Sequence, residues 1–274
     1  MLGCTSFQTL YLKTPEVTDA AKVTDTDSCA IINKSNLFKS IDMTQTAANT
    51  VNNEIVRFNM REARFNMIEQ QIRTWEVLDP VVLAVLDAVP RENFVAESQK
   101  GLAFADIELP IGEEQTMLSP KVEGRILQAV AVKKTDKVLV VGTGSGYLTA
   151  LLATLAGHVH AVEIHPELSV IAKERLQKQN IHNVTLHVAD AANGYAADAP
   201  YDVIVFTGSL PLRPVAAEKM LNVGGRLFAV IGEEPIMEAT LTQRISEDAF
   251  RHEAIFETCL PQIINAPQPE KFEF

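Results

Sequence analysis

Three closely spaced glycines form the part of the sequence best suited to hold a ligand. Gly142, Gly144 and Gly146 follow the apolar run VLVV and precede a segment of apolar residues with helical spacing. Glycine lets a ligand approach the backbone closely, and open α/β sheets bind ligands beyond the carboxyl ends of their strands. We therefore expect a cofactor site around residues 142–147.

Two nucleotide-binding motifs compete for this glycine turn. A dinucleotide fingerprint needs a third glycine where this sequence has Tyr147, so a nicotinamide cofactor is disfavoured. A triphosphate-binding loop needs Gly-Lys followed by Ser or Thr, which does not follow here.

Two acidic residues follow the turn at informative positions. Glu163 ends the next apolar run, about 20 residues beyond Gly142, where a carboxylate can accept hydrogen bonds from ribose hydroxyls. Asp190 ends the run after that and could accept a hydrogen bond from an adenine amino group. Either residue alone could be a solvated acid at a strand end. Together they suit an adenosyl ligand without phosphates.

Alternating strands and helices must position these residues. Apolar runs predict strands at 137–142, 158–164, 183–190, 201–209 and 226–232, with helices between them, which is typical of a parallel, doubly wound α/β sheet. Two runs near 237–246 and 251–260 predict an antiparallel hairpin at the sheet edge. Upstream, we expect a helix in 79–95 that stops at Pro90, an acid-rich loop at 106–120 and a helix at 121–132.

Composition narrows the classes of partner. The 274 residues carry 24 Lys and Arg against 35 Asp and Glu, a formal net charge of −11, which disfavours binding to nucleic acid or anionic membranes. There is no long apolar run for a membrane span. The three cysteines are widely spaced, so we expect free thiols and a cytoplasmic protein.

The first part of the chain differs from the rest. Residues 1–53 are polar with little periodicity, and we expect a mobile extension before a single domain at 54–274. Within that domain, 54–132 would form a helical subdomain with the active-site loop, and 133–274 the cofactor-binding core. The motif RFNM occurs at 57–60 and 64–67, so Phe58 and Phe65 would share one helix face, as would Met60 and Met67. Such a stripe usually packs on the body of a protein, although it could also bind a partner.

Several motifs carry a resemblance to a known family. GTGSGY, VEIHPE, VAD and NVGGRL resemble the class I S-adenosylmethionine-dependent methyltransferases. The upstream segments MIEQQIR, VPRENFV, LPIG and EQTM more specifically resemble protein-L-isoaspartate O-methyltransferases. The resemblance covers roughly residues 64–235.

The resemblance implies a Rossmann-like methyltransferase fold and an activity in protein repair. The methyl group of S-adenosyl-L-methionine would pass to the free α-carboxylate of an L-isoaspartyl residue in a damaged protein. A carboxylate of pKa near 3.5 is already anionic at neutral pH, so no strong base is needed. The loop 114–119 would cover the reacting groups, with Ser119 as the catalytic hydroxyl. The residues implied in cofactor binding are Thr116, Gly142, Thr143, Gly144, Gly146, Glu163, Asp190 and Ala191.

Four positions depart from the family pattern. Glu114 replaces a glycine, Leu118 stands where a serine is usual, and Ala191 follows Asp190 in place of a glycine. Val140 replaces an acid that helps to hold the methionine part of the cofactor. These changes keep two alternatives open: a methyltransferase with another acceptor, or a non-catalytic binding module of the same fold.

The spacing of the histidines along the sequence does not predict a metal site. His158 and His160 alternate on one strand and His165 follows, but no acid or cysteine completes a metal-binding spacing. We therefore expect no metal. The oligomeric state stays open.

Overall fold

The computed structural model describes residues 59–270. The expected extension over 1–53 and the domain boundary at 54 lie outside the described residues. Residues 59–67 are helical and continue into two short turns, η1 (Ile68–Ile72) and η2 (Arg73–Trp75). Within 59–270, no helix is both long enough and apolar enough to cross a membrane.

The repeated RFNM motif packs only in part. Met67 is 1% exposed, and Met60 packs against the core. Phe65, however, is 60% exposed, and Phe58 lies outside the described residues. The expectation of a packing stripe is therefore confirmed for the methionines and wrong for Phe65, because the Phe65 side of the helix faces away from the core.

Helix α2 (Pro80–Ala88) begins and ends where its flanking residues predict. It starts with a proline in its first turn, and the Asp79 side chain accepts a hydrogen bond of 2.8 Å from the Val81 amide. Pro90 follows the helix and prevents its extension. Two 3-10 turns, η3 (Arg91–Asn93) and η4 (Glu97–Leu102), lead towards α3 (Pro120–Val130).

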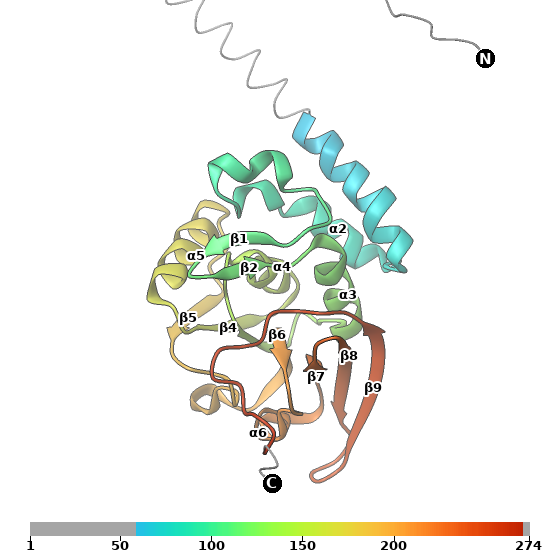
Figure 1. The fold of residues 1–274 in the computed structure, drawn as a ribbon, viewed down its shortest axis with the longest axis vertical. Helices are drawn as coiled ribbons and strands as arrows, with labels where there is room; N and C mark the ends of the chain where they lie inside the picture. Colours follow the sequence, from blue (N-terminus) through green and yellow to red (C-terminus); the bar gives the residue numbers. More distant parts are fainter. Residues whose placement is uncertain (1–58, 271–274) are drawn as a thin grey trace, which may run out of the picture. The chain divides into compact units, whose positions relative to one another are not determined.

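A seven-stranded sheet forms the core of the domain (Figure 1). Its order is β5-β4-β3-β6-β7-β8-β9, and β3, β4, β5, β6 and β7 run parallel to one another. The order reverses at β3, which is where a doubly wound sheet leaves a crevice for a ligand. The bounds are β3 (Lys137–Val141), α4 (Tyr147–Leu155), β4 (His158–Glu163), α5 (Pro166–Lys178), β5 (Val184–Val188), η5 (Ala196–Asp198), β6 (Tyr201–Leu210), α6 (Val215–Glu218) and β7 (Leu221–Glu233).

The expected edge hairpin is present. Strands β8 (Ile236–Arg244) and β9 (Phe250–Glu257) pair antiparallel, and β8 pairs antiparallel with β7. The doubly wound sheet, the helical subdomain and the terminal hairpin are thus confirmed.

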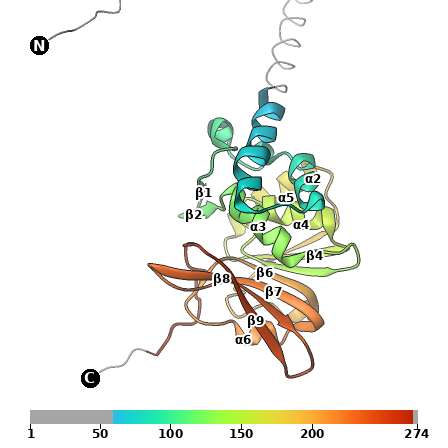
Figure 2. The ribbon, with the colours of Figure 1, turned by 90° about the vertical axis from the view of Figure 1, so that its right-hand side faces the viewer.

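The two faces of the sheet bury different clusters. Helices α2–α5 pack with the alternate strand residues Val138, Val140 and Val205 in the larger cluster, and Figure 2 shows these helices on one side of the sheet. The other face, with Leu139 and Val141, packs against α6 and the chain before β6. The alternation of side chains along each strand decides which cluster a residue joins.

The segment expected as a loop at 106–120 contains a small hairpin. Strand β1 (Leu109–Gly112) pairs antiparallel with β2 (Gln115–Met117). Glu113 and Glu114 form the turn, with φ of 50° and 57°. This left-handed geometry is the one that tight hairpins prefer, so the expectation of an irregular loop is corrected.

Candidate functional site

A cavity opens at the carboxyl ends of β3, β4 and β5. The space within it, including open solvent at its mouth, is about 700 Å³. The chain segments that line it are residues 111, 115–116, 118, 141–142, 144, 162–164, 168, 189–192, 207–208 and 261–264.

The glycine turn leaves β3 directly under this cavity. Gly142 has φ of 88°, and a Cβ there would lie 2.2 Å from Thr207 Oγ1. That hydroxyl lies within hydrogen-bonding distance of the carbonyls of Val141 and Gly142, at 3.0 and 2.9 Å. The turn is therefore held by β6, and only glycine fits at position 142.

Glu163 closes one side of the turn. Its side chain is buried, and its two oxygens accept hydrogen bonds from the amides of Gly144, at 2.8 Å, and His165, at 3.1 Å. A carboxylate has about four acceptor positions, so two remain for hydroxyl groups in the cavity.

Asp190 stands beyond the end of β5 in a comparable arrangement. Its Oδ1 accepts from the Ala192 amide at 3.0 Å, and its Oδ2 accepts from Asn265 Nδ2 at 2.8 Å. These bonds fix the carboxylate and leave it further acceptor capacity towards the cavity.

The hairpin and the residue after it cover the opposite side. Ile111, Gln115 and Thr116 line the cavity from β1 and β2. Thr116 Oγ1 donates to Glu108 Oε2 at 2.8 Å, and Glu113 Oε2 lies 3.9 Å from His165 Nδ1. The tip of the hairpin therefore lies close to the turn that leads into α5.

A buried arginine holds the segment between the hairpin and α3. Arg91 is fully buried, pairs with Glu123 and donates hydrogen bonds to the carbonyls of Ala103 and Leu118, at 2.8 and 2.6 Å. Burial raises the pKa of Glu123, the positive charge of Arg91 opposes this rise, and the resulting pKa is about 8. Sequence reasoning assigned no role to Arg91, although it stands in the VPRENFV motif.

Six of the nine residues expected at the site line the cavity: Thr116, Gly142, Gly144, Glu163, Asp190 and Ala191. Thr143, Gly146 and Ser119 do not. Gly146 begins α4, and a Cβ there would lie 3.2 Å from Ala172 Cβ, so it lets α4 and α5 pack closely. Thr143 Oγ1 is buried without a hydrogen-bond partner among the described residues.

A catalytic hydroxyl is expected inside the cavity, but the structure places Leu118 there and Ser119 outside it. Leu118 lines the cavity, whereas Ser119 is buried at the start of α3 and its side chain makes no capping hydrogen bond. A catalytic role of Ser119 stays a prediction, and this placement does not support it. Val140, another of the four departures, is fully buried on the helix-covered face of the sheet.

Sequence reasoning missed the wall formed by residues 261–264. This segment carries no periodic pattern and is positioned by backbone hydrogen bonds to β6. The Ser209 amide donates to the Pro261 carbonyl and the Ile263 amide donates to the Ser209 carbonyl, both at 2.9 Å.

The expectation that the histidines lack an acidic partner is corrected. His160 lies close to His187 and Asp198, which come from the neighbouring strand and the following turn. The spacing along the sequence does not reveal this cluster, because strand pairing brings the two histidines together and the fold of the chain at η5 adds Asp198.

Comparisons with known proteins agree with the fold. The family model described as protein-L-isoaspartate(D-aspartate) O-methyltransferase matches residues 62–259. A relative from Protochlamydia amoebophila named protein-L-isoaspartate O-methyltransferase is 40% identical over 186 residues, 68% of this chain and 88% of its own length. One of the same name from Rhodopseudomonas palustris is 36% identical over 208 residues, 74% of this chain and 95% of its own.

Solved structures show the same fold. One named protein-L-isoaspartate O-methyltransferase has a TM-score of 0.64 and 26% identity, over 74% of this chain and 65% of that chain, slightly under two thirds of it. A Plasmodium falciparum structure, described as a beta-aspartate methyltransferase in complex with S-adenosyl-L-homocysteine, has a TM-score of 0.62 and 17% identity, over 74% of this chain and 97% of that chain. The sequence matches span most of the domain, and on them the chain belongs to the protein-L-isoaspartate O-methyltransferase family.

Proposed function

We propose that this protein transfers a methyl group from S-adenosyl-L-methionine to the α-carboxylate of L-isoaspartyl residues in damaged proteins. One observation carries the proposal: two oriented carboxylates, Glu163 and Asp190, line the same cavity as the glycine turn, in a chain of this family. The substrates would be proteins or peptides that contain isoaspartate.

The residues of the cavity fit the cofactor. Glu163 would accept hydrogen bonds from the ribose hydroxyls and Asp190 from the adenine amino group, because both keep acceptor capacity after their bonds within the protein. Gly142, Gly144 and Ala191 leave room for a ligand against the backbone. When bound, S-adenosylmethionine supplies an electrophilic methyl group.

The protein's own contribution would be alignment and the exclusion of water. Ile111 and Leu118 give the cavity apolar walls, and the hydrogen bond from Thr116 to Glu108 joins the two arms of the hairpin that covers it. Alignment of two reacting groups lowers the entropic part of the barrier, and a dry site strengthens the electrostatic interactions within it. The acceptor carboxylate is already anionic at neutral pH, so the site needs no strong general base.

Domain limits and compartment are part of the proposal. We take 54–274 as the catalytic domain, since the family model matches residues 62–259 within it. The cytoplasm is the proposed compartment, because three widely spaced cysteines do not form a disulfide framework.

The test compares two glutamate variants by calorimetry and by methyl transfer. Glu163→Gln keeps the shape of the side chain and removes the negative charge that would accept hydrogen bonds from the cofactor. Glu167→Gln makes the same change at an exposed position of α5. We expect Glu163→Gln to weaken S-adenosylhomocysteine binding about tenfold or more, since a hydrogen bond to a charged group contributes about 1.5–3 kcal/mol. Glu167→Gln should bind like the wild type. Equal affinities for both variants would refute the placement of the cofactor.

The identity of the acceptor is tested by measuring methyl transfer from a radiolabelled donor to an isoaspartyl peptide and to the same peptide with a normal aspartyl residue. Transfer selective for the isoaspartyl peptide supports the proposal. A second candidate, a methyltransferase with another acceptor, is favoured by Leu118, which presents an apolar side chain where the family resemblance implies a hydroxyl. Cofactor binding without transfer to the isoaspartyl peptide would select that candidate, and absence of cofactor binding would leave a non-catalytic module.

A further inference from the structure

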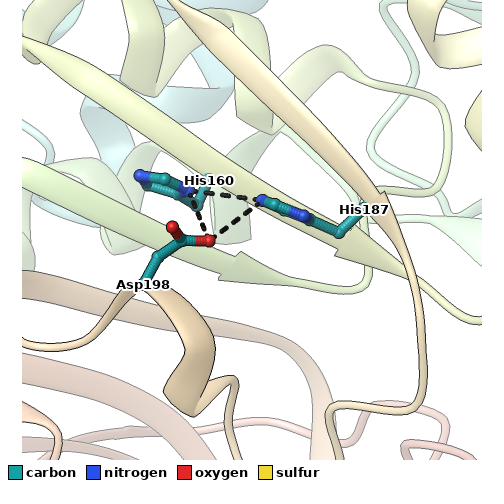
Figure 3. Close-up of side chains that lie close together, drawn as sticks. All are labelled: His160, His187 and Asp198. Atoms are coloured by element: carbon teal, nitrogen blue, oxygen red, sulfur yellow. Dashed lines mark hydrogen bonds and ion pairs between the residues drawn. The ribbon is translucent and has the colours of Figure 1, made fainter.

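Two histidines and an aspartate converge on the face of the sheet opposite helices α2–α5. His160 lies on β4, His187 on the edge strand β5 and Asp198 at the end of η5 (Figure 3). Val162 pairs with His187 across the two strands, and because His160 and Val162 point to the same face, both imidazoles do too. None of the three lines the methyltransferase cavity.

The three facing atoms are almost equidistant. His160 Nδ1 lies 3.3 Å from His187 Nε2 and 3.3 Å from Asp198 Oδ2, and His187 Nε2 lies 3.4 Å from Asp198 Oδ2. Tetrahedral zinc with bonds of about 2.0–2.2 Å requires ligand atoms about 3.3–3.5 Å apart. The triangle therefore already has the dimensions of one face of a zinc tetrahedron.

His160 and His187 lie within hydrogen-bonding distance of each other, but no placement of the ring hydrogens gives a hydrogen bond at all three contacts. Each distance exceeds the usual 2.9–3.0 Å of an N–H···O hydrogen bond. If both nitrogens carry a hydrogen, both can donate to Asp198, but nothing then joins the two rings. If only one of the two nitrogens carries a hydrogen, the contact between the other nitrogen and Asp198 contains no hydrogen. A cation between the three atoms satisfies all of them at once.

A neighbouring tyrosine orients one of the rings. Tyr195 Oη lies 3.2 Å from His187 Nδ1, and the Tyr195 carbonyl accepts a hydrogen bond of 2.7 Å from Tyr201 Oη. With its hydrogen on Nδ1, His187 donates to Tyr195 and presents the Nε2 lone pair to the cluster. Histidine ligands of metals are commonly oriented in this way through their other ring nitrogen.

The cluster is accessible yet largely enclosed. The side chains of His160, His187 and Asp198 are 12%, 19% and 34% exposed, respectively. An ion can therefore enter beside Asp198, and a water molecule can take the fourth position. Two imidazoles with one carboxylate favour zinc and similar transition metals over Ca²⁺ and Mg²⁺, which prefer oxygen ligands.

We propose that His160, His187 and Asp198 form a zinc(II) site that is separate from the methyltransferase cavity. The ion would join β4, the edge strand β5 and η5, and so fasten the segment between Asp190 and Asp198 to the sheet. Because binding requires the folded arrangement of all three ligands, zinc stabilises the folded state.

The test uses the full-length protein without a polyhistidine tag, treated with a chelator and returned to metal-free buffer. Calorimetric titration with zinc chloride measures stoichiometry and affinity for the wild type, His187→Asn and Asp198→Asn. His182→Asn is the matched control, because His182 is exposed and lies outside the cluster. We expect one zinc per chain, affinity at least about tenfold weaker in both ligand variants, and no change in the control.

Two further readouts do not depend on the variants folding. Zinc should raise the melting temperature of the wild type, and cobalt(II) in its place should give the intense visible absorption of four-coordinate geometry. A weak six-coordinate spectrum, equal affinity of wild type and His187→Asn, or equal loss in His182→Asn would overturn the proposal. The zinc titration, the melting temperature and the cobalt spectrum do not measure methyl transfer, so their results do not depend on the proposed enzymatic function.

Discussion

Arg91 donates a hydrogen bond of 2.6 Å to the carbonyl oxygen of Leu118, 27 residues further along the chain. The side chain of Leu118 lines the cavity. A fully buried guanidinium in the helical subdomain therefore fixes the backbone of a residue in the cavity wall. Because the same guanidinium pairs with Glu123 on α3, it couples the position of that wall to the packing of the subdomain.

Removal of the Arg91 charge should strongly destabilise the fold. Arg91→Met leaves the buried Glu123 and the Leu118 carbonyl without their partner, and breaking a buried pair costs about 3–5 kcal/mol. Urea denaturation measures the free energy of unfolding. Arg73→Met is the control, because Arg73 forms an exposed pair with Glu69 that contributes at most about 1 kcal/mol. Similar losses in both variants would contradict the role assigned to Arg91.

The cost of Arg91→Met should also grow with pH. Burial raises the folded-state pKa of Glu123 to about 8 from 4.5, with Arg91 opposing the rise. A raised carboxyl pKa gives stability that is present below pH 4.5 and is lost as pH rises through the folded-state value. Without Arg91 that folded-state pKa rises further, so the variant keeps losing stability above pH 8, where the wild type has stopped.

Denaturation of both proteins at pH 6, 7, 8 and 9 measures this difference. We expect the gap in unfolding free energy between wild type and Arg91→Met to widen from pH 7 to pH 9. A constant gap would mean that Glu123 does not titrate in this range in the folded protein.

A methyl group at Gly142 should disable the glycine turn. Gly142→Ala places a side chain at φ of 88° and within 2.2 Å of Thr207 Oγ1. The left-handed backbone alone costs about 1–2 kcal/mol, and the clash pushes β6 away from the turn. We expect lower stability and at least about tenfold weaker S-adenosylhomocysteine binding by calorimetry.

Gly101→Ala provides the control for the glycine turn. A Cβ at Gly101 meets nothing within 4 Å, and its φ lies outside the left-handed region. This variant should retain the affinity and stability of the wild type. If Gly142→Ala also behaves like the wild type, the turn does not approach the ligand.

Ser119→Ala should have little effect on catalysis. Ser119 lies outside the cavity lining and makes no capping hydrogen bond, so loss of its hydroxyl should change kcat/KM by less than about threefold. Transfer to an isoaspartyl peptide measures it, with Ser98→Ala at an exposed position as the control. A hundredfold fall in kcat confined to Ser119→Ala would instead establish its hydroxyl as catalytic.

The parallel strands and their connecting helices could be predicted closely from the sequence. Buried parallel strands are continuous apolar runs, and the run 137–142 corresponds to β3 at Lys137–Val141. Asp79-Pro80 and Pro90 marked the limits of α2 because capping is a local interaction. The glycine turn, Glu163 and Asp190 were found because the fold places strand ends together.

Other features depend on contacts between distant residues and gave no local signal. The β1–β2 hairpin was missed because its turn uses Glu113 and Glu114 in left-handed conformations that Asn and Gly usually adopt. His187 approaches His160 through the pairing of β4 with β5, and Asp198 approaches it from η5. The placement of Leu118 inside the cavity, with Ser119 outside it, depends on how α3 begins.

The wall at residues 261–264 has a consequence for protein synthesis. The ribosome makes the hairpin, the glycine turn, Glu163 and Asp190 before it makes this wall, which lies beside Gly208. A chain whose translation stops after β9 would carry every carboxylate of the site but an open trough in place of a cavity. A chain without residues 261–264 should therefore bind the cofactor more weakly and gain less stability from it.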